Sequence, residues 1–105
     1  MKRLLLSPAA KQDRRNEVSY YRTEAGAPVA QRLVEALQNA SRDLEQQPGM
    51  GSPALGIELG IEGMRTWRLD DFPLSLWYFE RADHVLIARV IGHRQEAEFI
   101  DVMKG

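Results

Sequence analysis

One amphipathic segment constrains the fold of this chain more than any other feature of its sequence. Between residues 28 and 46, apolar side chains recur every three or four residues, which predicts a helix of about five turns with a single apolar face. This face consists of Ala30, Leu33, Leu37, Ala40 and Leu44. Gln47-Pro48-Gly49 ends the helix, because proline and glycine prevent its continuation. Such a face must be buried against another element, so the chain needs a second layer.

The sequence from residue 64 onwards predicts that second layer. Residues 64–69, 74–81 and 85–93 are rich in Trp, Tyr, Phe, Val and Ile, which is typical of strands. Short connections separate them, and consecutive strands joined so closely must be antiparallel. Residues 48–63 contain five glycines and two prolines and are expected to form a long loop. Residues 99–103 have the apolar spacing of a last helical turn or of an added strand.

The N-terminal part predicts a strand followed by a helix. Residues 3–6 fit a short strand, and Ser7-Pro8 begins a helix expected to run to about Arg22, since serine caps free N–H groups and proline at the first helical position loses no hydrogen bond. Arg14 and Glu17 interrupt the apolar face of this helix. The expected fold is α+β, with an N-terminal strand and a two-helix hairpin packed on a small antiparallel sheet.

Composition excludes several classes of protein. The 105 residues suit a single domain over 1–105, and the absence of cysteine excludes disulfides and thiolate metal sites. The two histidines have no second ligand at metal spacing, and the glycines of 48–63 match no phosphate loop, so neither a metal nor a cofactor is expected. The three leucines near the N-terminus are too few for a signal peptide, and no apolar run approaches a membrane span. A cytoplasmic protein is expected.

The charge is unevenly distributed along the chain. The net charge is −1, yet residues 1–42 carry eight basic and four acidic side chains. Eleven of the 14 cations are arginines, which suit planar, bidentate contacts with carboxylates or phosphates. This pattern indicates an interaction surface without naming its partner.

The order of several short motifs resembles ParE-type toxins of the RelE/ParE superfamily over nearly the whole chain. The motifs are Leu6-Ser7-Pro8-Ala9-Ala10 with Asp13 and Tyr20-Tyr21, then Pro48-Gly49-Met50-Gly51, Gly63-Met64-Arg65-Thr66-Trp67-Arg68-Leu69, Phe72-Pro73, Tyr78-Phe79 and the strand at 85–91. Two features depart from the family. Arg14 and Glu17 replace apolar residues, and they either pair with each other or leave that face to a partner. Gly92-His93 exchanges the usual order of histidine and small residue.

The resemblance implies the toxin of a type II toxin–antitoxin module, neutralised by a small ParD-like antitoxin. Known ParE toxins act on DNA gyrase, whereas RelE relatives cut mRNA in the ribosome. RNA cleavage needs proton transfer and cationic groups at the phosphate. Arg68 and Arg94 lie near two basic positions of RelE-type nucleases, and His93 could supply the acid. Ser75 stands where another arginine is expected, and Phe99-Ile100 where the family has a tyrosine, so the catalytic set is incomplete.

The favoured hypothesis is therefore a toxin that inhibits gyrase by binding and has no catalytic residues. Its partner-binding residues are predicted to be five arginines of the strand region, which would meet acidic groups of the antitoxin: Arg65, Arg68, Arg81, Arg89 and Arg94. Arg89 interrupts the apolar face of the last strand and is expected to meet a carboxylate or to leave that face open. The alternatives are a ribosome-dependent mRNA endonuclease using Arg68, His93 and Arg94, and an inactive relative that only binds its antitoxin.

Overall fold

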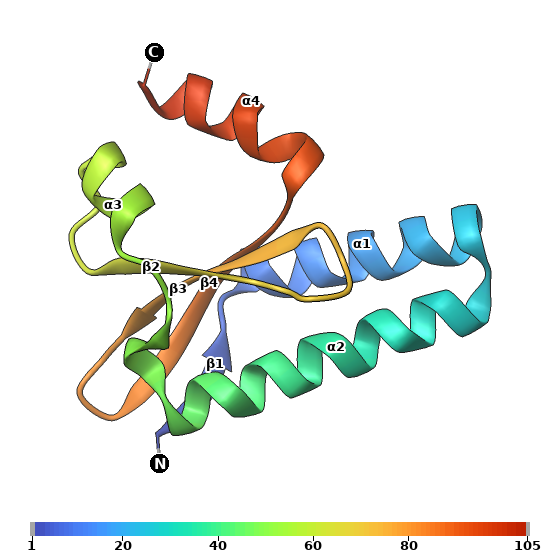
Figure 1. The fold of residues 1–105 in the computed structure, drawn as a ribbon, viewed down its shortest axis with the longest axis horizontal. Coiled ribbons are helices and arrows are strands. Elements are labelled where there is room, and N and C mark those ends of the chain that lie inside the picture. Colours follow the sequence, from blue (N-terminus) through green and yellow to red (C-terminus); the bar gives the residue numbers. More distant parts are fainter. Residues whose placement is uncertain (1, 105) are drawn as a thin grey trace.

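The structure is a computed structural model that describes residues 2–104. A four-stranded sheet is combined with two long helices and three short ones (Figure 1). In chain order the elements are β1 (Arg3–Leu6), α1 (Pro8–Ala25), α2 (Ala27–Gln46), the 3₁₀ helix η1 (Pro48–Met50), α3 (Ala54–Leu59), β2 (Met64–Arg68), β3 (Leu74–Glu80), β4 (His84–Gly92) and α4 (His93–Lys104). The predicted α+β fold is confirmed.

The sheet has the strand order β1-β4-β3-β2. β2, β3 and β4 form the antiparallel meander that their short connections predict. β1 pairs with β4 in parallel, so the whole sheet is mixed. A parallel pair needs a long crossover, and the helical hairpin lies in the stretch of chain between these two strands.

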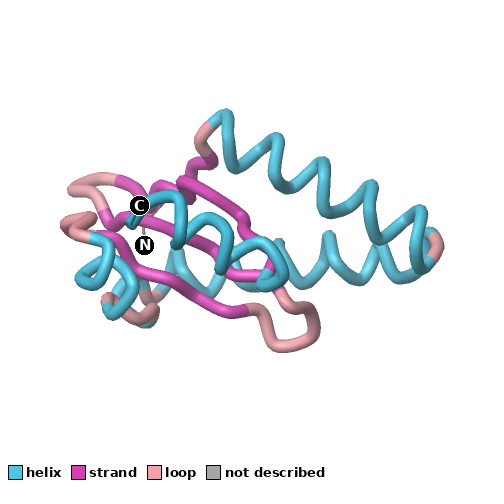
Figure 2. Tube along the Cα trace, turned by 90° about the horizontal axis from the view of Figure 1, so that it is seen from above, coloured by secondary structure: helices cyan, strands magenta, loops and turns pink. Residues whose placement is uncertain are grey.

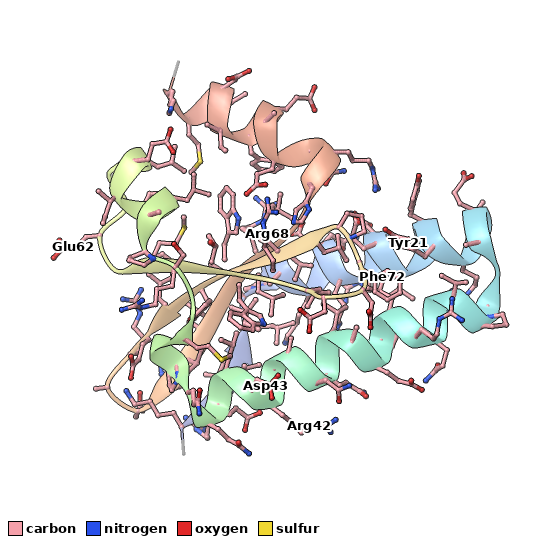
Figure 3. The ribbon with its side chains drawn as sticks, in the orientation of Figure 1. Tyr21, Arg42, Asp43, Glu62, Arg68 and Phe72 are labelled. Atoms are coloured by element: carbon pink, nitrogen blue, oxygen red, sulfur yellow. The ribbon has the colours of Figure 1, made fainter. Side chains whose placement is uncertain are left out.

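The α1–α2 hairpin packs on one face of the sheet, as the apolar stripe predicts. All five stripe residues are buried, and Leu33, Leu37 and Leu44 belong to one core with Leu76 and Ile87 of the sheet. Figure 2 shows that the far end of the hairpin projects beyond the strands. There α1 contacts the β2–β3 loop through Tyr21, whose ring meets Phe72 edge-on at 5.3 Å between centroids (Figure 3). None of the helices in the described part of the chain is long and apolar enough to cross a membrane.

The other face of the sheet is covered by α3 and α4. The prediction of a long loop over 48–63 is wrong, because η1 and α3 lie within it. Gly56 lets α3 approach β2 closely, since a Cβ there would lie 2.5 Å from the Met64 carbonyl oxygen. Gly60 ends α3 in the left-handed conformation at φ 71°. The glycines thus permit close packing and a helix end rather than an irregular loop.

A bulge changes which face the last residues of β4 occupy. Tyr78 pairs with Ile87 but Trp77 pairs with Arg89, so Ala88 is an extra residue in β4. As a result Val85, Ile87 and Val90 join the core under the hairpin, whereas Ile91 joins the cluster on the α3–α4 face. Arg89 therefore does not interrupt the apolar row as strict alternation predicts.

Candidate functional site

A groove of about 930 Å³ lies where α1, α2 and the β1 side of the sheet meet. We call this feature the groove. Its apolar lining comes from both helices and three strands: Leu4, Leu6, Val18, Val34, Leu37, Leu76, Ile87 and Val90. The groove exists because the thin apolar face of α1 does not cover the whole inner face of the sheet, so that Leu4, Leu6, Val18 and Val34 stay only half-buried.

Four exposed arginines border this apolar surface, and we call them the arginine rim: Arg14, Arg15 and Arg22 of α1 and Arg42 of α2. None of the four forms an ion pair within residues 2–104. Arg15 donates to Gln12 at 3.0 Å, and Arg42, which extends from α2 in Figure 3, donates to Asn39. Glu45 is the one carboxylate among the residues that line the groove. The groove is therefore apolar inside and cationic at its border.

Arg14 and Glu17 do not pair with each other. Arg14 lies at the groove, whereas Glu17 is only 4% exposed and faces the junction of β4 and α4. The expectation that Arg14 and Glu17 pair is therefore wrong, and Arg14 lies on an open face as the alternative predicted.

The opposite side of α1 carries two carboxylates that hold arginines of the β4–α4 region. Asp13 accepts hydrogen bonds from Nε and Nη2 of Arg89 at 2.7 and 2.9 Å, which confirms that Arg89 meets a carboxylate. The same carboxylate accepts from the Val90 N–H at 3.0 Å. Hydrogen bonding to Asp13 raises the pKa of Arg89 above its usual value.

Glu17 is held differently from Asp13. Its two carboxylate oxygens each lie 3.5 Å from Nη2 of Arg94, a long contact for a charged pair. The Arg94 guanidinium also lies 4.0 Å from the centroid of the Tyr20 ring. Burial raises the pKa of Glu17, although the positive charge of Arg94 acts in the opposite direction.

The remaining predicted partner-binding arginines lie apart from one another. Arg65 donates to the Gly51 carbonyl at 2.6 Å, and Arg81 lies 4.8 Å from the ring centroid of Phe79. Arg68 is exposed on the α4 side of the sheet, with Nη2 3.9 Å from Glu96 (Figure 3). The five strand-region arginines therefore do not converge on one surface.

The alternative nuclease set is brought together only in part. The hydroxyl of Ser75 lies 2.9 Å from Nε2 of His93, and Ser75 is paired across the sheet with Arg68. Arg68, Ser75 and Glu96 border a hollow of about 500 Å³ beside α3. Arg94 contacts Glu17 instead, so this hollow has a single guanidinium. Within residues 2–104, no three His, Cys, Asp or Glu side chains form a group that could hold a metal ion.

These features define a small α+β domain with an open apolar groove that arginines border. The family model described as the ParE toxin of the type II toxin–antitoxin system parDE matches residues 4–105. The chain therefore belongs to the ParE toxin family, as its motifs predict.

The other comparisons bear on the fold. Among solved structures, a chain of the chromosomal ParDE toxin–antitoxin system from P. aeruginosa is similar, with a TM-score of 0.75 and 22% identity. The match covers 88% of this chain and 96% of that one, so the two share the fold. No curated protein sequence matches the chain.

Sequence reasoning did not identify the arginine rim as a site. Two signals for it were present, namely the positive charge of residues 1–42 and the cation at position 14 within the apolar face of the first helix. Only the packing of α1 against β4 distinguishes Arg14, which stays exposed, from Glu17, which becomes buried.

Proposed function

We propose that this ParE-family chain is the toxin of a type II pair, that a ParD-like antitoxin silences it by binding in the groove, and that it inhibits DNA gyrase by binding. The toxin class follows from the family. The antitoxin contact, the gyrase target and action in the cytoplasm are the proposed parts.

The groove with its arginine rim is the observation that carries the antitoxin contact. A partner segment with apolar side chains can bury them against Val18, Val34 and Leu37, which contributes about 25 cal/mol per Å² of apolar surface. Carboxylates beside those side chains would meet guanidinium groups that have no ion pair within residues 2–104. Such complementary charge accelerates association and selects the acidic partner. The expected occupant is an acidic, amphipathic segment of the antitoxin.

The outer edge of β1 offers a second contact to the same segment. β1 is an edge strand that pairs only with β4, and its side chains Leu4 and Leu6 line the groove. An extended peptide can add to such an edge through backbone hydrogen bonds while its side chains enter an adjoining pocket. An antitoxin that adds a strand here and continues as a helix between α1 and α2 would cover the whole groove.

Inhibition by binding is favoured over RNA cleavage by the contacts of Arg94. A nuclease centre needs several cations at one phosphate, but Arg94 is held by the buried Glu17 and stacks on Tyr20. Phe99 and Ile100, which stand where the family has a tyrosine, have no hydroxyl, and neither lines the hollow that contains Arg68. The contact between His93 and Ser75 is the one observation that favours the endonuclease, which remains the second candidate.

Two parallel assays of the purified protein test the target. In the first, gyrase supercoils relaxed plasmid with increasing amounts of the protein. In the second, ribosomes translate an mRNA whose fragments are mapped. We expect loss of supercoiling or accumulation of cleaved DNA with intact mRNA, and we expect His93→Ala to inhibit gyrase as the natural chain does.

Codon-dependent mRNA cuts that disappear in His93→Ala and Arg68→Ala would instead establish the endonuclease. A chain that binds an antitoxin tightly but affects neither assay would be an inactive relative. Prior addition of the antitoxin serves as the control, because supercoiling should then persist if occupation of the groove blocks the inhibitory surface.

A further inference from the structure

The C-terminal helix α4 is attached to the sheet with little burial. In Figure 1 it leaves the end of β4, stands off from the strands and runs toward α3. None of its twelve residues is buried, and Val102 and Met103 are 81% and 51% exposed. In contrast, α2 buries five residues over its length. Helices are held to a protein mainly by their buried apolar faces, so α4 is weakly held.

Three charged contacts and one aromatic side chain connect α4 to the rest of the domain. Arg94 contacts Glu17 at its first turn, Glu96 lies 3.9 Å from Arg68, and Lys104 donates to Glu58 of α3. The apolar contribution comes mainly from Phe99, whose ring centroid lies 6.3 Å from that of Trp77 and 4.8 Å from the Arg89 guanidinium. Exposed ion pairs contribute little and are weakened by salt, whereas the Arg94–Glu17 contact is screened less because Glu17 is buried.

The surface beneath α4 contains an unsatisfied donor. The side chain of Trp77 is only 3% exposed, and its Nε1 has no hydrogen-bond partner within residues 2–104. A buried N–H without an acceptor is unfavourable, so the packing between Trp77 and the Phe99 ring of α4 includes one uncompensated polar group.

The junction between β4 and α4 limits where such a movement can start. The His93 N–H donates to the Pro73 carbonyl at 2.8 Å, and the His93 ring contacts Ser75. These two contacts fix the first residue of α4 to the sheet. A movement would therefore begin after His93, and Arg94 is the first residue that has to leave its partner.

We propose that α4 is a detachable cover, latched by Arg94 on Glu17, whose release exposes a cationic and aromatic face of the sheet. That face carries Arg68, Trp77 and Arg89. The proposal goes beyond the proposed function, because it requires neither the antitoxin nor the target. It makes the free protein an equilibrium between a covered and an uncovered form, with the latch setting the populations.

Hydrogen exchange of the full chain, followed by mass spectrometry, tests the latch. We expect the amides of 95–104 to exchange at least about tenfold faster than those of β3, and Arg94→Ala to accelerate them by about a further tenfold with β3 and α2 unchanged. Asp101→Asn is the matched control, because Asp101 is an exposed charge on the same helix without an ion pair within residues 2–104. Its exchange should equal that of the natural sequence.

A second readout follows the covered face directly. In a Trp67→Phe background, Trp77 is the only tryptophan, and acrylamide quenching of its fluorescence reports how often the cover is open. We expect quenching to rise in Arg94→Ala and in Glu17→Gln, and to rise only modestly between about 50 and 500 mM NaCl, because salt screens the exposed pairs of α4 more than the contact to the buried Glu17. The proposal is overturned if α4 exchanges as slowly as β3, or if neither variant changes exchange or quenching while both remain folded.

Discussion

The Asp13 carboxylate accepts hydrogen bonds from both the Arg89 side chain and the Val90 N–H, so α1 becomes the neighbour of β4 beyond the end of β1. β1 pairs with β4 only as far as Ile87. Beyond that point side chains form the hydrogen bonds to the backbone at this edge of β4. Ser7 Oγ donates to the Ala88 carbonyl at 2.7 Å, and Asp13 accepts from the Val90 N–H. The bulge at Ala88 turns Arg89 toward the α4 face, where its guanidinium lies over Phe99. The Asp13 carboxylate thus connects α1 to β4 and also holds the Arg89 guanidinium that contacts Phe99 of α4.

Removal of this carboxylate should be costly. Asp13→Ala leaves the half-buried Arg89 guanidinium and the Val90 N–H without their acceptor, so we expect the free energy of unfolding to fall by about 2–3 kcal/mol. Urea unfolding monitored by circular dichroism measures the loss. Asp43→Ala is the control, because Asp43 is exposed on α2 and forms no ion pair within the described residues (Figure 3). Equal stability of the two variants would contradict the structural role of Asp13.

Gly51 should tolerate no side chain. A Cβ at this position would lie 2.4 Å from the Tyr78 hydroxyl and 2.7 Å from the Thr66 carbonyl oxygen. The buried hydroxyl of Tyr78 accepts from the Gly51 N–H at 2.8 Å and donates to the Pro48 carbonyl at 2.7 Å, so it cannot move aside without breaking these hydrogen bonds. We expect Gly51→Ala to lower the free energy of unfolding by about 2–3 kcal/mol.

Gly49→Ala is the matched control in the same loop, since no atom lies within 4 Å of a Cβ there. Its stability should stay unchanged or rise by up to about 1 kcal/mol, because alanine restricts the unfolded chain. Thermal unfolding of both variants checks the difference. If the Gly51→Ala and Gly49→Ala proteins had the same melting temperature, the 48–51 segment would have to move away from Tyr78 in solution.

The fold was largely predictable because its strongest periodic signals lie in the elements that form the core. The stripe from Ala30 to Leu44 and the β-rich segments after residue 64 are buried as their patterns indicate. The parallel pairing of β1 with β4 was not predictable, because it depends on the direction in which the chain after the α1–α2 hairpin comes back alongside β1. α3 was missed because three of the five glycines in 48–63 serve its packing or the turns that follow it.

The site was less predictable than the fold. Residue type marks arginines as binding residues, but Arg89 and Arg94 are engaged by carboxylates 76 and 77 positions earlier in the chain. Their partners, Asp13 and Glu17, lie on the side of α1 that faces the sheet end, whereas Arg14 and Arg22 lie at the groove. Arg14 and Glu17 lie within about one helical turn of each other, yet only Glu17 is buried inside the domain. This difference depends on the tertiary packing of α1 and cannot be read from residue type.

The buried Glu17 should make stability depend on pH with a defined sign. Because burial raises its pKa in the folded state, the folded chain holds this proton more tightly than the unfolded chain. The contribution of Glu17 to stability is therefore most favourable below the ordinary carboxyl pKa and is lost as pH rises through the raised folded-state pKa. Glu17→Gln removes this loss, so it should be more stable than the natural chain at pH 7 but not at pH 4.

Urea unfolding of both proteins across this pH range tests that prediction. The gain in global stability should accompany faster hydrogen exchange in α4, because the amide no longer attracts Arg94 as a carboxylate does. Arg94→Ala is the comparison variant, since it also loosens α4 but keeps the buried Glu17 carboxyl, and so it should show no gain in global stability at pH 7. A Glu17→Gln protein with an unchanged pH profile would show that Glu17 titrates as an exposed carboxylate.

The arginine rim should control how fast the antitoxin binds. Arg14→Ala with Arg22→Ala removes two exposed cations from the border of the groove and leaves its apolar lining intact. We expect the affinity for the antitoxin to fall about tenfold, mainly through a slower association rate whose salt dependence is also reduced. Stopped-flow or surface-based kinetics at several salt concentrations measure both effects. Arg32→Ala removes an exposed cation of α2 that does not line the groove, so its association rate should match that of the natural chain. Equal slowing by Arg32→Ala would mean that the antitoxin responds to the overall charge of the hairpin and that the groove is not its docking site.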